Sequence, residues 1–326
     1  MTKRGTTRSQ MKVNLGTLIA LFGILVLFAF TAPSFFKVDN ILNLFRSLST
    51  NMLLTLGVTL CLLIGGTDLS VGQSVALCNI CCALFILKGV PWYFAAPVAI
   101  AIGTFIGIIN GVIIAYAHVP PFIQTLAMKV ILEGLSYIIG NAEAALMITQ
   151  SNFNIIGNGS VLGFIPIPTI IMFGVAIIFG VLTTKTSFGA KMFAIGGNIN
   201  AANYSGVNIK RVQITCYALS GMAASLAGVI TLARLSGGQP DIGNGKELTA
   251  IASAVVGGIS FSGGKGTIGG AVFGAIFIGC LLNGMSVWGL STYWQDVVTG
   301  FVVLAALLFN FINTQLKERK PSRTQG

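Results

Sequence analysis

Residues 188–211 read Phe-Gly-Ala-Lys-Met-Phe-Ala-Ile-Gly-Gly-Asn-Ile-Asn-Ala-Ala-Asn-Tyr-Ser-Gly-Val-Asn-Ile-Lys-Arg and lead into an apolar run that continues past Gly228. This is the longest polar interval in the chain that keeps helical content, and the sequence around it is nearly all hydrophobic. Lys185, Lys191, Lys210 and Arg211 bracket it. A small-residue, helical segment between apolar runs is typical of a docking surface. We therefore expect the loop at about 185–211 to receive a protein partner.

The composition predicts a membrane protein. The chain has 326 residues, of which 54% are hydrophobic and 8% are charged. Soluble domains carry roughly a quarter charged residues, so this chain lacks the polar groups to cover a globular surface. Several apolar runs reach the ~20 residues that a helix needs to cross a bilayer. The runs are continuous and do not alternate, which favours helices over a barrel. We expect a polytopic, all-α protein with one domain over residues 1–326.

Helix breakers divide the chain into about ten expected transmembrane spans. They lie at 13–31, 46–64, 70–88, 93–116, 121–140, 164–184, 212–235, 248–260, 268–289 and 293–312. The run at 248–260 is too short to cross alone and is expected to be broken or re-entrant. The first run could instead be a signal peptide. It is a full span long, however, and no small-x-small cleavage site precedes Pro33, so we expect it to be retained.

The distribution of positive charge predicts the orientation. Most of the 19 Lys and Arg residues flank the spans on the amino-terminal side, at 3–12, 185–211, 265 and 317–323. The opposite side carries Lys37, Arg46, Lys88, Arg234 and Lys246. Cytoplasmic loops of membrane proteins are enriched in Lys and Arg. Both termini and the 185–211 loop are therefore predicted to be cytoplasmic, with 141–163 outside. The net charge of +11 is explained by this pattern, and we expect no nucleic-acid partner.

Residues for catalysis, metal binding or ATP hydrolysis are missing from the sequence pattern. His118 is the single histidine and cannot build a multi-histidine metal site. The segment 263–267 resembles a phosphate loop but has Ile259 and Gly266 where that motif needs a glycine and a hydroxyl. The cysteines are interpreted as packing residues of the spans: Cys61, Cys78, Cys81, Cys82, Cys216 and Cys280. We expect no enzymatic activity, cofactor or metal, so any pumping needs an energy-supplying partner.

Two sets of polar residues fall inside or between the spans. Asp68 and Ser70 lie in the polar turn 65–72. Either can cap the helix that follows, or Asp68 can line a central cavity, since carboxylates at this depth often mark pathways. Both readings stay open. Lys129 and Glu133 stand four residues apart in one span, and we expect them to pair on one helix face.

A family resemblance follows from motifs spread over essentially the whole chain. The sequence resembles the permease subunits of bacterial ribose-type ABC sugar importers. The motifs are Gly66-Thr-Asp-Leu-Ser-Val-Gly72, Pro121-Phe-Ile-Gln-Thr-Leu126, Ala194-Ile-Gly-Gly-Asn198, Ala201-Ala202, Ser205-Gly206, Ser220-Gly221, Ala227-Gly228, Ala252-Ser-Ala-Val-Val-Gly-Gly258, Gly263-Gly-Lys-Gly-Thr-Ile268 and Asn283-Gly284.

The resemblance implies a binding-protein-dependent importer in the bacterial cytoplasmic membrane. Its partners would be an ABC ATPase, as two ATP-binding domains or one tandem protein, a second permease copy or paralogue, and a periplasmic or lipid-tethered sugar-binding protein. ATP would be used by the partner ATPase. The residues implied for ATPase coupling are Gly189, Ala194, Gly196, Gly197, Asn198, Ala201, Ala202, Ser205 and Gly206. The possible translocation-pathway residues are Asp68, Ser70 and Asn283.

The cargo remains open within this architecture. We expect a monosaccharide such as ribose, allose, xylose or a galactose-type sugar. Related ten-helix permeases carry nucleosides or branched-chain amino acids. A secondary carrier coupled to protons or sodium is a further alternative, but it would need several ionisable groups near the midplane. Only the Lys129 and Glu133 pair qualifies in this sequence.

Overall fold

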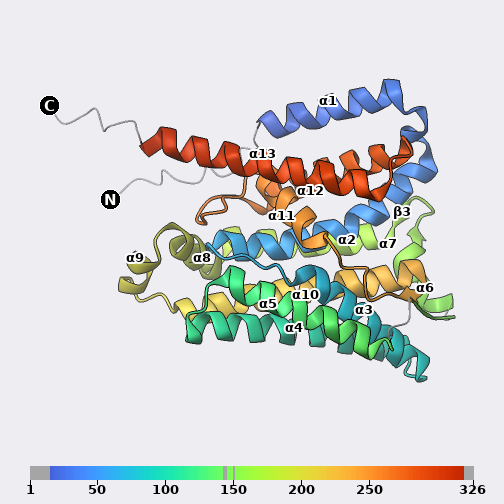
Figure 1. Ribbon diagram of the computed structural model, residues 1–326, viewed down its shortest axis with the longest axis horizontal. Helices are drawn as coiled ribbons and strands as arrows, with labels where there is room; N and C mark the ends of the chain where they lie inside the picture. Colours follow the sequence, from blue (N-terminus) through green and yellow to red (C-terminus); the bar gives the residue numbers. More distant parts are fainter. Residues whose placement is uncertain (1–14, 142–144, 150, 319–326) are drawn as a thin grey trace.

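The computed structural model describes residues 15–141, 145–149 and 151–318. Its helices lie roughly along one long axis and form a single bundle (Figure 1). Long apolar runs fold as helices because, in lipid, backbone N–H and C=O groups must be satisfied within the segment. The helices of the bundle are α1 (Leu15–Thr31), α2 (Val38–Leu63), α3 (Val71–Leu87), α4 (Trp92–Ala117), α5 (Pro121–Ile139), α7 (Ile167–Lys185), α10 (Ile209–Leu235), α11 (Lys246–Val256), α12 (Ile268–Val287) and α13 (Thr292–Glu318).

Helix length and composition identify a multi-pass membrane protein. Among the described residues, six helices are long and apolar enough to cross a membrane, namely α2, α4, α5, α7, α10 and α12. The apolar helix α3 is shorter, as is the stretch Leu21–Thr31 of α1. Helix α11 has 11 residues, which agrees with the prediction that 248–260 does not cross alone. The total of ten spans remains a prediction, and the start of the first span at 13 lies outside the described residues.

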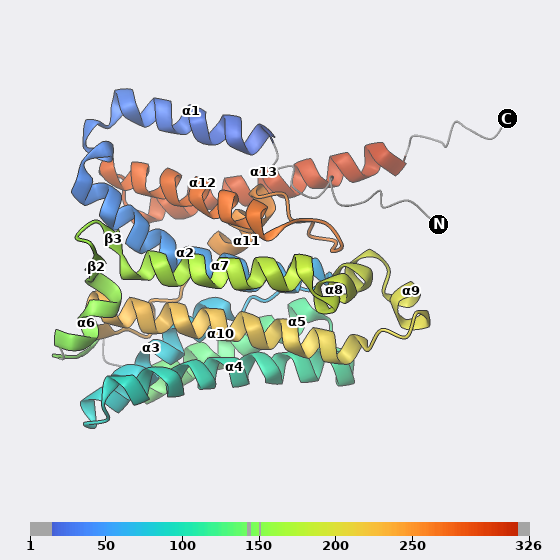
Figure 2. The same ribbon diagram turned by 180° about the vertical axis from the view of Figure 1, so that it is seen from behind.

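Helices α2 and α10 lie in the middle of the bundle. Figures 1 and 2 show α1, α12 and α13 on one flank and α4 and α5 on the other. Helix α10 packs along α4, α2 and α3. Close approach to α4 depends on glycines, because small residues let the backbones of two helices come near each other. A Cβ at Gly103 would collide with Ser225, and one at Gly107 would collide with the backbone of Tyr217.

Short elements occupy the two ends of the bundle. At one end lie α8 (Ser187–Gly197) and α9 (Ile199–Tyr204). At the other lie η1 (Pro33–Phe36), α6 (Ser151–Asn158) and the strands β1 (Leu146–Met147), β2 (Ser160–Val161), β3 (Ile165–Pro166) and β4 (Gly237–Gly238). Strand β1 pairs antiparallel with β4, and β2 with β3. These two-residue ladders were not predicted. They tie together connections between helices and leave the helical class unchanged.

The end that carries α8 and α9 also receives other chain segments. Helix α13 ends on that side, and α1 begins toward it (Figures 1 and 2). Helix α7 leads into α8, and α9 leads into α10. The start of α1 and the end of α13 thus lie on the same side of the bundle as α8 and α9, while the predicted side of the termini stays a prediction. The cations at 3–12 and 319–323 lie outside the described residues, and the assignment of this end to the cytoplasm stays a prediction.

Candidate functional site

Three polar residues shape the segment between α7 and α10. The first N–H groups of a helix have no partner within it, so a side-chain oxygen at the preceding position stabilises the start. Thr186 accepts from the backbone N–H of Gly189 at 3.3 Å. Asn198 accepts from that of Ala201 at 3.0 Å, and Asn208 begins α10 in the same way. Thr186 and Asn198 each end one helix and begin the next, whereas Asn208 only begins α10, after α9 has ended at Tyr204. These caps explain why a polar interval stays helical.

Helices α8 and α9 present one face to the bundle and one outward. Met192 and Ile195 are buried in the main hydrophobic core together with residues of α2 and α10. The predicted coupling residues divide between the two faces. Gly189, Gly196 and Ala202 pack inward. Ala194, Gly197, Asn198, Ala201, Ser205 and Gly206 are exposed. Tyr204 joins this exposed set with a relative exposure of 90%, and it was not predicted.

Gly196 packs closely against the bundle. A Cβ there would collide with the carbonyl oxygen of Leu63 and the backbone nitrogen of Gly264. Those two atoms are themselves hydrogen-bonded at 3.0 Å. Gly264 has a φ of +70°, a left-handed conformation that favours glycine. The 263–267 segment, which fails as a phosphate loop, therefore builds a turn on which α8 rests.

Asp68 is enclosed in a hydrogen-bonded network between helices. Its side chain is buried, with 1% relative exposure. The Ser70 hydroxyl donates to Oδ1 at 2.6 Å and the Ser220 hydroxyl donates to Oδ2 at 2.7 Å. The amide of Asn110 on α4 donates to the Ser70 hydroxyl at 2.9 Å. The network joins the α2–α3 turn to α10 and α4, which meets the requirement that a buried carboxylate be hydrogen-bonded.

The N-terminus of α3 differs from the simple cap that the sequence allows. Ser70 occupies the N-cap position, but its side chain makes no capping bond to the helix. Its hydroxyl instead bonds to Asp68, which also accepts from the backbone N–H of Ser70 at 3.1 Å. Neither residue lines the cavity described next. A role of Asp68 and Ser70 in the pathway thus remains a proposal.

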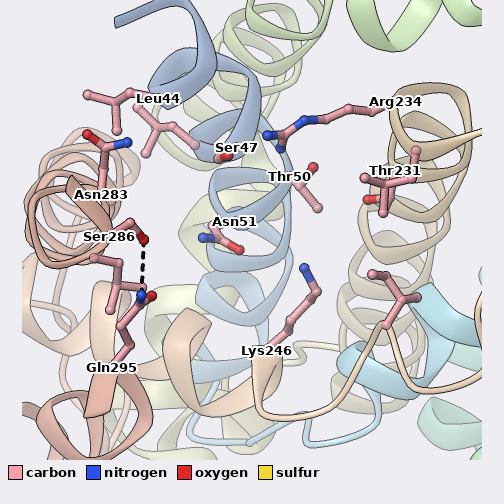
Figure 3. A pocket seen from close by; sticks show the side chains of 15 residues that line it. Leu44, Ser47, Thr50, Asn51, Thr231, Arg234, Lys246, Asn283, Ser286 and Gln295 are labelled. Carbon is pink, nitrogen blue, oxygen red and sulfur yellow. Dashed lines mark hydrogen bonds between the residues drawn. The ribbon is translucent and has the colours of Figure 1, made fainter. Parts of the chain in front are cut away.

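A cavity of about 290 Å³ lies between α2, α10, α11, α12 and α13 (Figure 3). This is just under the ~300–1,000 Å³ of typical small-molecule pockets. Asn283, one of the predicted pathway residues, belongs to its lining, and its role in transport stays a prediction. The polar side chains around it are Ser47, Thr50, Asn51, Thr231, Arg234, Lys246, Asn283, Ser286 and Gln295, and the apolar ones are Leu44, Leu48, Leu235, Ile242 and Leu282.

The cavity occupies the half of the bundle distant from α8 and α9. Its α2 residues, Leu44 to Asn51, come from the first half of that helix, whereas Leu63 at the other end contacts the 264 turn beneath α8. The α12 lining also comes from the end of its helix, at Asn283 and Ser286. The cavity is therefore closer to the end that carries α6 and the short strands.

Hydrogen bonds hold part of the cavity wall in place. Asn283 and Asn40 exchange two amide bonds of 2.9 and 3.2 Å, which join α12 to the start of α2. Gln295 of α13 donates to the Ser286 hydroxyl of α12 at 3.0 Å. On the opposite wall, the guanidinium group of Arg234 and the ammonium group of Lys246 point into the open volume (Figure 3). The site is rich in hydrogen-bond donors, and no Asp or Glu is among its lining residues.

The predicted pair of Lys129 and Glu133 is wrong. Lys129 on α5 instead forms an ion pair with Glu247 at the start of α11, with 2.5 Å between Nζ and Oε1. The Glu247 side chain is 3% exposed and that of Lys129 is 26% exposed. A carboxylate as buried as Glu247 needs a cation, and this requirement outweighs the weak preference of a pair within one helix.

Sequence reasoning missed most residues of the cavity. Arg234 and Lys246 appeared only in the count of charges near span ends. One feature of the sequence could have marked both cations as candidate site residues: neither has an acidic residue one helical turn away on its own helix. Over the residues that the structure describes, no group of three or more His, Cys, Asp or Glu side chains is placed to hold a metal ion.

A bundle with six helices long and apolar enough to cross a membrane among its described residues, together with a buried polar network and a polar cavity, defines a multi-pass membrane protein. Residues 40–307 match the family described as branched-chain amino acid transport system / permease component. The chain belongs to this family of transport permeases. No solved structure is significantly similar to it.

Curated relatives match nearly the full length. The chain is 41% identical over 298 residues to the ribose import permease protein of Bacillus subtilis strain 168, covering 91% of this chain and 92% of that protein. It is 37% identical over 294 residues to the D-allose transport system permease protein of Escherichia coli K12, covering 90% of each. It is 34% identical over 320 residues to the galactose/methyl galactoside import permease protein of the same strain, covering 93% of this chain and 95% of that protein.

Proposed function

We propose that this chain is the membrane-spanning permease subunit of an ATP-driven importer for a monosaccharide in the bacterial cytoplasmic membrane. The observation that carries the proposal is the polar cavity of about 290 Å³ within an otherwise apolar bundle. Sugar hydroxyls both donate and accept hydrogen bonds, and the amides and hydroxyls of Asn51, Thr50 and Ser286 can do the same. The relatives named for ribose, allose and galactose transport support this substrate class.

The exposed side of α8 and α9 is the surface we assign to the ATPase partner. We define this docking face as Ala194, Gly197, Asn198, Ala201, Tyr204 and Ser205, all of which are exposed. On the other side of the same helices, Met192 and Ile195 are buried in one core with residues of α2. A displacement of α8 and α9 by the ATPase would thus be transmitted to α2, which lines the cavity. ATP hydrolysis belongs to the partner in this proposal.

We assign the remaining partners to the two ends of the bundle. The positive-inside rule predicts that the α8 and α9 end faces the cytoplasm, and the cavity would then lie in the outer half of the membrane. A periplasmic or lipid-tethered sugar-binding protein would deliver its cargo on that outer side. A second permease copy or paralogue would complete the membrane part of the transporter.

Import of a branched-chain amino acid is the second candidate, because the family description names that cargo. Such a substrate carries an ammonium group, which needs a carboxylate or several strong acceptors when it is desolvated. No Asp or Glu lines the cavity, while Arg234 and Lys246 would repel the ammonium group. A proton-coupled or sodium-coupled carrier is disfavoured because it would need several ionisable groups near the midplane, and Lys129 is already held in an ion pair with Glu247.

Transport by the reconstituted protein tests these alternatives. Liposomes would contain either the chain alone or the chain with the ATPase and the sugar-binding protein of the same transporter. Uptake of labelled L-leucine, of the neutral sugars D-ribose, D-allose and D-galactose, and of the anionic sugars D-ribose 5-phosphate and D-ribonate is measured with internal ATP or with a pH gradient. We expect accumulation of a sugar only with ATP and all partners present. Gradient-driven accumulation by the chain alone, or ATP-driven accumulation of leucine but no sugar, would contradict the proposal.

A further inference from the structure

Two cations from different elements converge on the cavity. Arg234 stands one residue before the end of α10, and Lys246 is the first residue of α11. Both side chains line the cavity and extend into it from the same wall (Figure 3). They stand across the open volume from the amides of Asn283 and Gln295. The connection between α10 and α11 therefore brings two positive charges to one side of a polar volume.

Neither cation is neutralised by a described residue. The side chains of Arg234 and Lys246 make no hydrogen bond or ion pair to the part of the chain that the structure describes. Glu247 follows Lys246 directly, but its carboxylate pairs with Lys129. Asp241 lies in the preceding connection, where it is exposed and outside the cavity lining. Among the residues that the structure describes, no acid compensates this local excess of positive charge.

Neighbouring groups add to this positive field. Arg46 donates to the backbone oxygen of Asn158 at 3.0 Å, and the Asn158 amide donates to the backbone oxygen of Arg234 at 3.0 Å. A third cation is therefore held next to the end of α10. Lys246 also occupies the first turn of α11, where the helix dipole is positive and disfavours a cation. Charges of one sign around a concave, low-dielectric site attract a ligand of the opposite sign.

We propose that the transported monosaccharide carries an anionic group, a phosphate or a carboxylate, which Arg234 and Lys246 bind. This inference rests on the proposed function as a sugar permease. The guanidinium group suits an anion with two oxygens, and the ammonium group supplies a second point charge. The amides and hydroxyls of the facing wall remain for the neutral hydroxyl groups of the sugar. A neutral sugar would leave both cations without a counter-charge.

Two other sources of negative charge compete for this site. An anionic lipid headgroup carries the same phosphate chemistry, and free inorganic phosphate does so without a sugar. The cavity favours the sugar derivative because amide and hydroxyl groups make up most of its polar lining, and a phosphate alone would leave the facing wall without partners. The competing ligands are distinguished by the test below.

Binding to the purified full chain in phosphatidylcholine nanodiscs tests the inference. The melting temperature is measured as a function of the concentration of D-ribose, D-ribose 5-phosphate, D-ribonate or inorganic phosphate. The same titrations are then repeated in nanodiscs that also contain phosphatidylglycerol. We expect one of the anionic sugars to bind at least about tenfold more tightly than D-ribose, since hydrogen bonds to charged groups are the stronger ones. Arg234→Gln and Lys246→Gln should each remove this preference.

Matched variants separate a binding role from a structural one. Lys88→Gln removes an exposed cation that does not line the cavity, and it should keep the preference. Arg234→Lys retains the charge and should keep most of it. If Arg234→Gln does not fold, Lys246→Gln decides the outcome by itself.

Three results would overturn the inference. Equal affinity for neutral and anionic sugars in the wild type would remove it and leave sugar import intact. A preference that survives both glutamine variants would place the anion elsewhere. Equal stabilisation by inorganic phosphate or phosphatidylglycerol would assign the cations to phosphate or lipid. Failure of the proposed function would be recognised separately, by the absence of ATP-driven sugar uptake in the reconstituted complex.

Discussion

Substituting alanine for Gly196 tests how α8 is seated on the bundle. The added methyl group would collide with two backbone atoms, the Leu63 oxygen and the Gly264 nitrogen. Backbone atoms of two hydrogen-bonded turns cannot move aside as a flexible side chain can, so α8 must shift. The neighbouring Gly197 is a matched control, because a Cβ there meets nothing within 4 Å.

The difference between the two variants isolates the cost of that collision. Both Gly196 and Gly197 belong to α8, so replacing either with alanine brings a similar gain in helix propensity of at most about 1 kcal/mol. This gain largely cancels when Gly196→Ala is compared with Gly197→Ala. Overpacking a tight contact costs about 1–3 kcal/mol. We therefore expect the free energy of unfolding of Gly196→Ala to be lower than that of Gly197→Ala by that amount, roughly a 5-fold to 150-fold change in the equilibrium constant.

Thermal unfolding of the purified variants in detergent measures this difference. Gly196→Ala should melt several degrees below Gly197→Ala. In the reconstituted transporter, Gly196→Ala should also lower the amount of sugar imported per ATP hydrolysed, because α8 no longer lies firmly on α2. Equal melting temperatures for the two variants would refute the seating of α8 on the 63 and 264 turns.

Three further predictions concern the network, the ion pair and the docking face. Asp68→Ala leaves buried hydroxyl donors without an acceptor and should destabilise the chain by about 3 kcal/mol or more, whereas unchanged unfolding with lost uptake would support a pathway role instead. Glu247→Gln breaks a buried ion pair and should lower the free energy of unfolding by about 3 kcal/mol, while Glu133→Gln should change it by no more than about 0.5 kcal/mol. A larger loss with Glu133→Gln in the same unfolding assay would indicate that Lys129 pairs with Glu133 instead. Tyr204→Glu should abolish co-purification of the ATPase and leave the melting temperature unchanged, because the Tyr204 side chain is 90% exposed. As a control, replacing the exposed Tyr293 at the opposite end of the bundle, in Tyr293→Ala, should retain the ATPase. An intact complex with Tyr204→Glu would argue against the docking face.

Hydropathy and helix breakers predicted the elements well where a helix meets lipid or apolar core. The span expected at 93–116 is α4, at Trp92–Ala117. The span expected at 46–64 begins earlier, at Val38, because polar residues such as Asn40 continue the helix. Asn40 is satisfied by Asn283 across 243 positions of sequence. A local window sees a polar residue and ends the span, since it cannot register a distant partner.

The candidate site was predictable only in part for the same reason. Small and polar residues predicted that 188–206 is a surface segment, and one side of α8 and α9 is exposed. Which side of α8 faces outward was decided by packing: Gly196 touches Leu63 and Gly264, while Gly197 is open. The cavity combines residues of five helices and one connection, and no motif in the sequence connects them.

The sequence by itself determined that this chain is helical, crosses a membrane several times and resembles a sugar permease, because hydropathy, breakers and ordered motifs are properties of short segments. Only the tertiary structure decided which groups meet. Lys129 finds Glu247 at a separation of 118 residues, and Arg234 and Lys246 face one polar volume without an acid. Such pairings depend on how distant helices pack, and the energy of a buried charge depends on the partner that packing supplies.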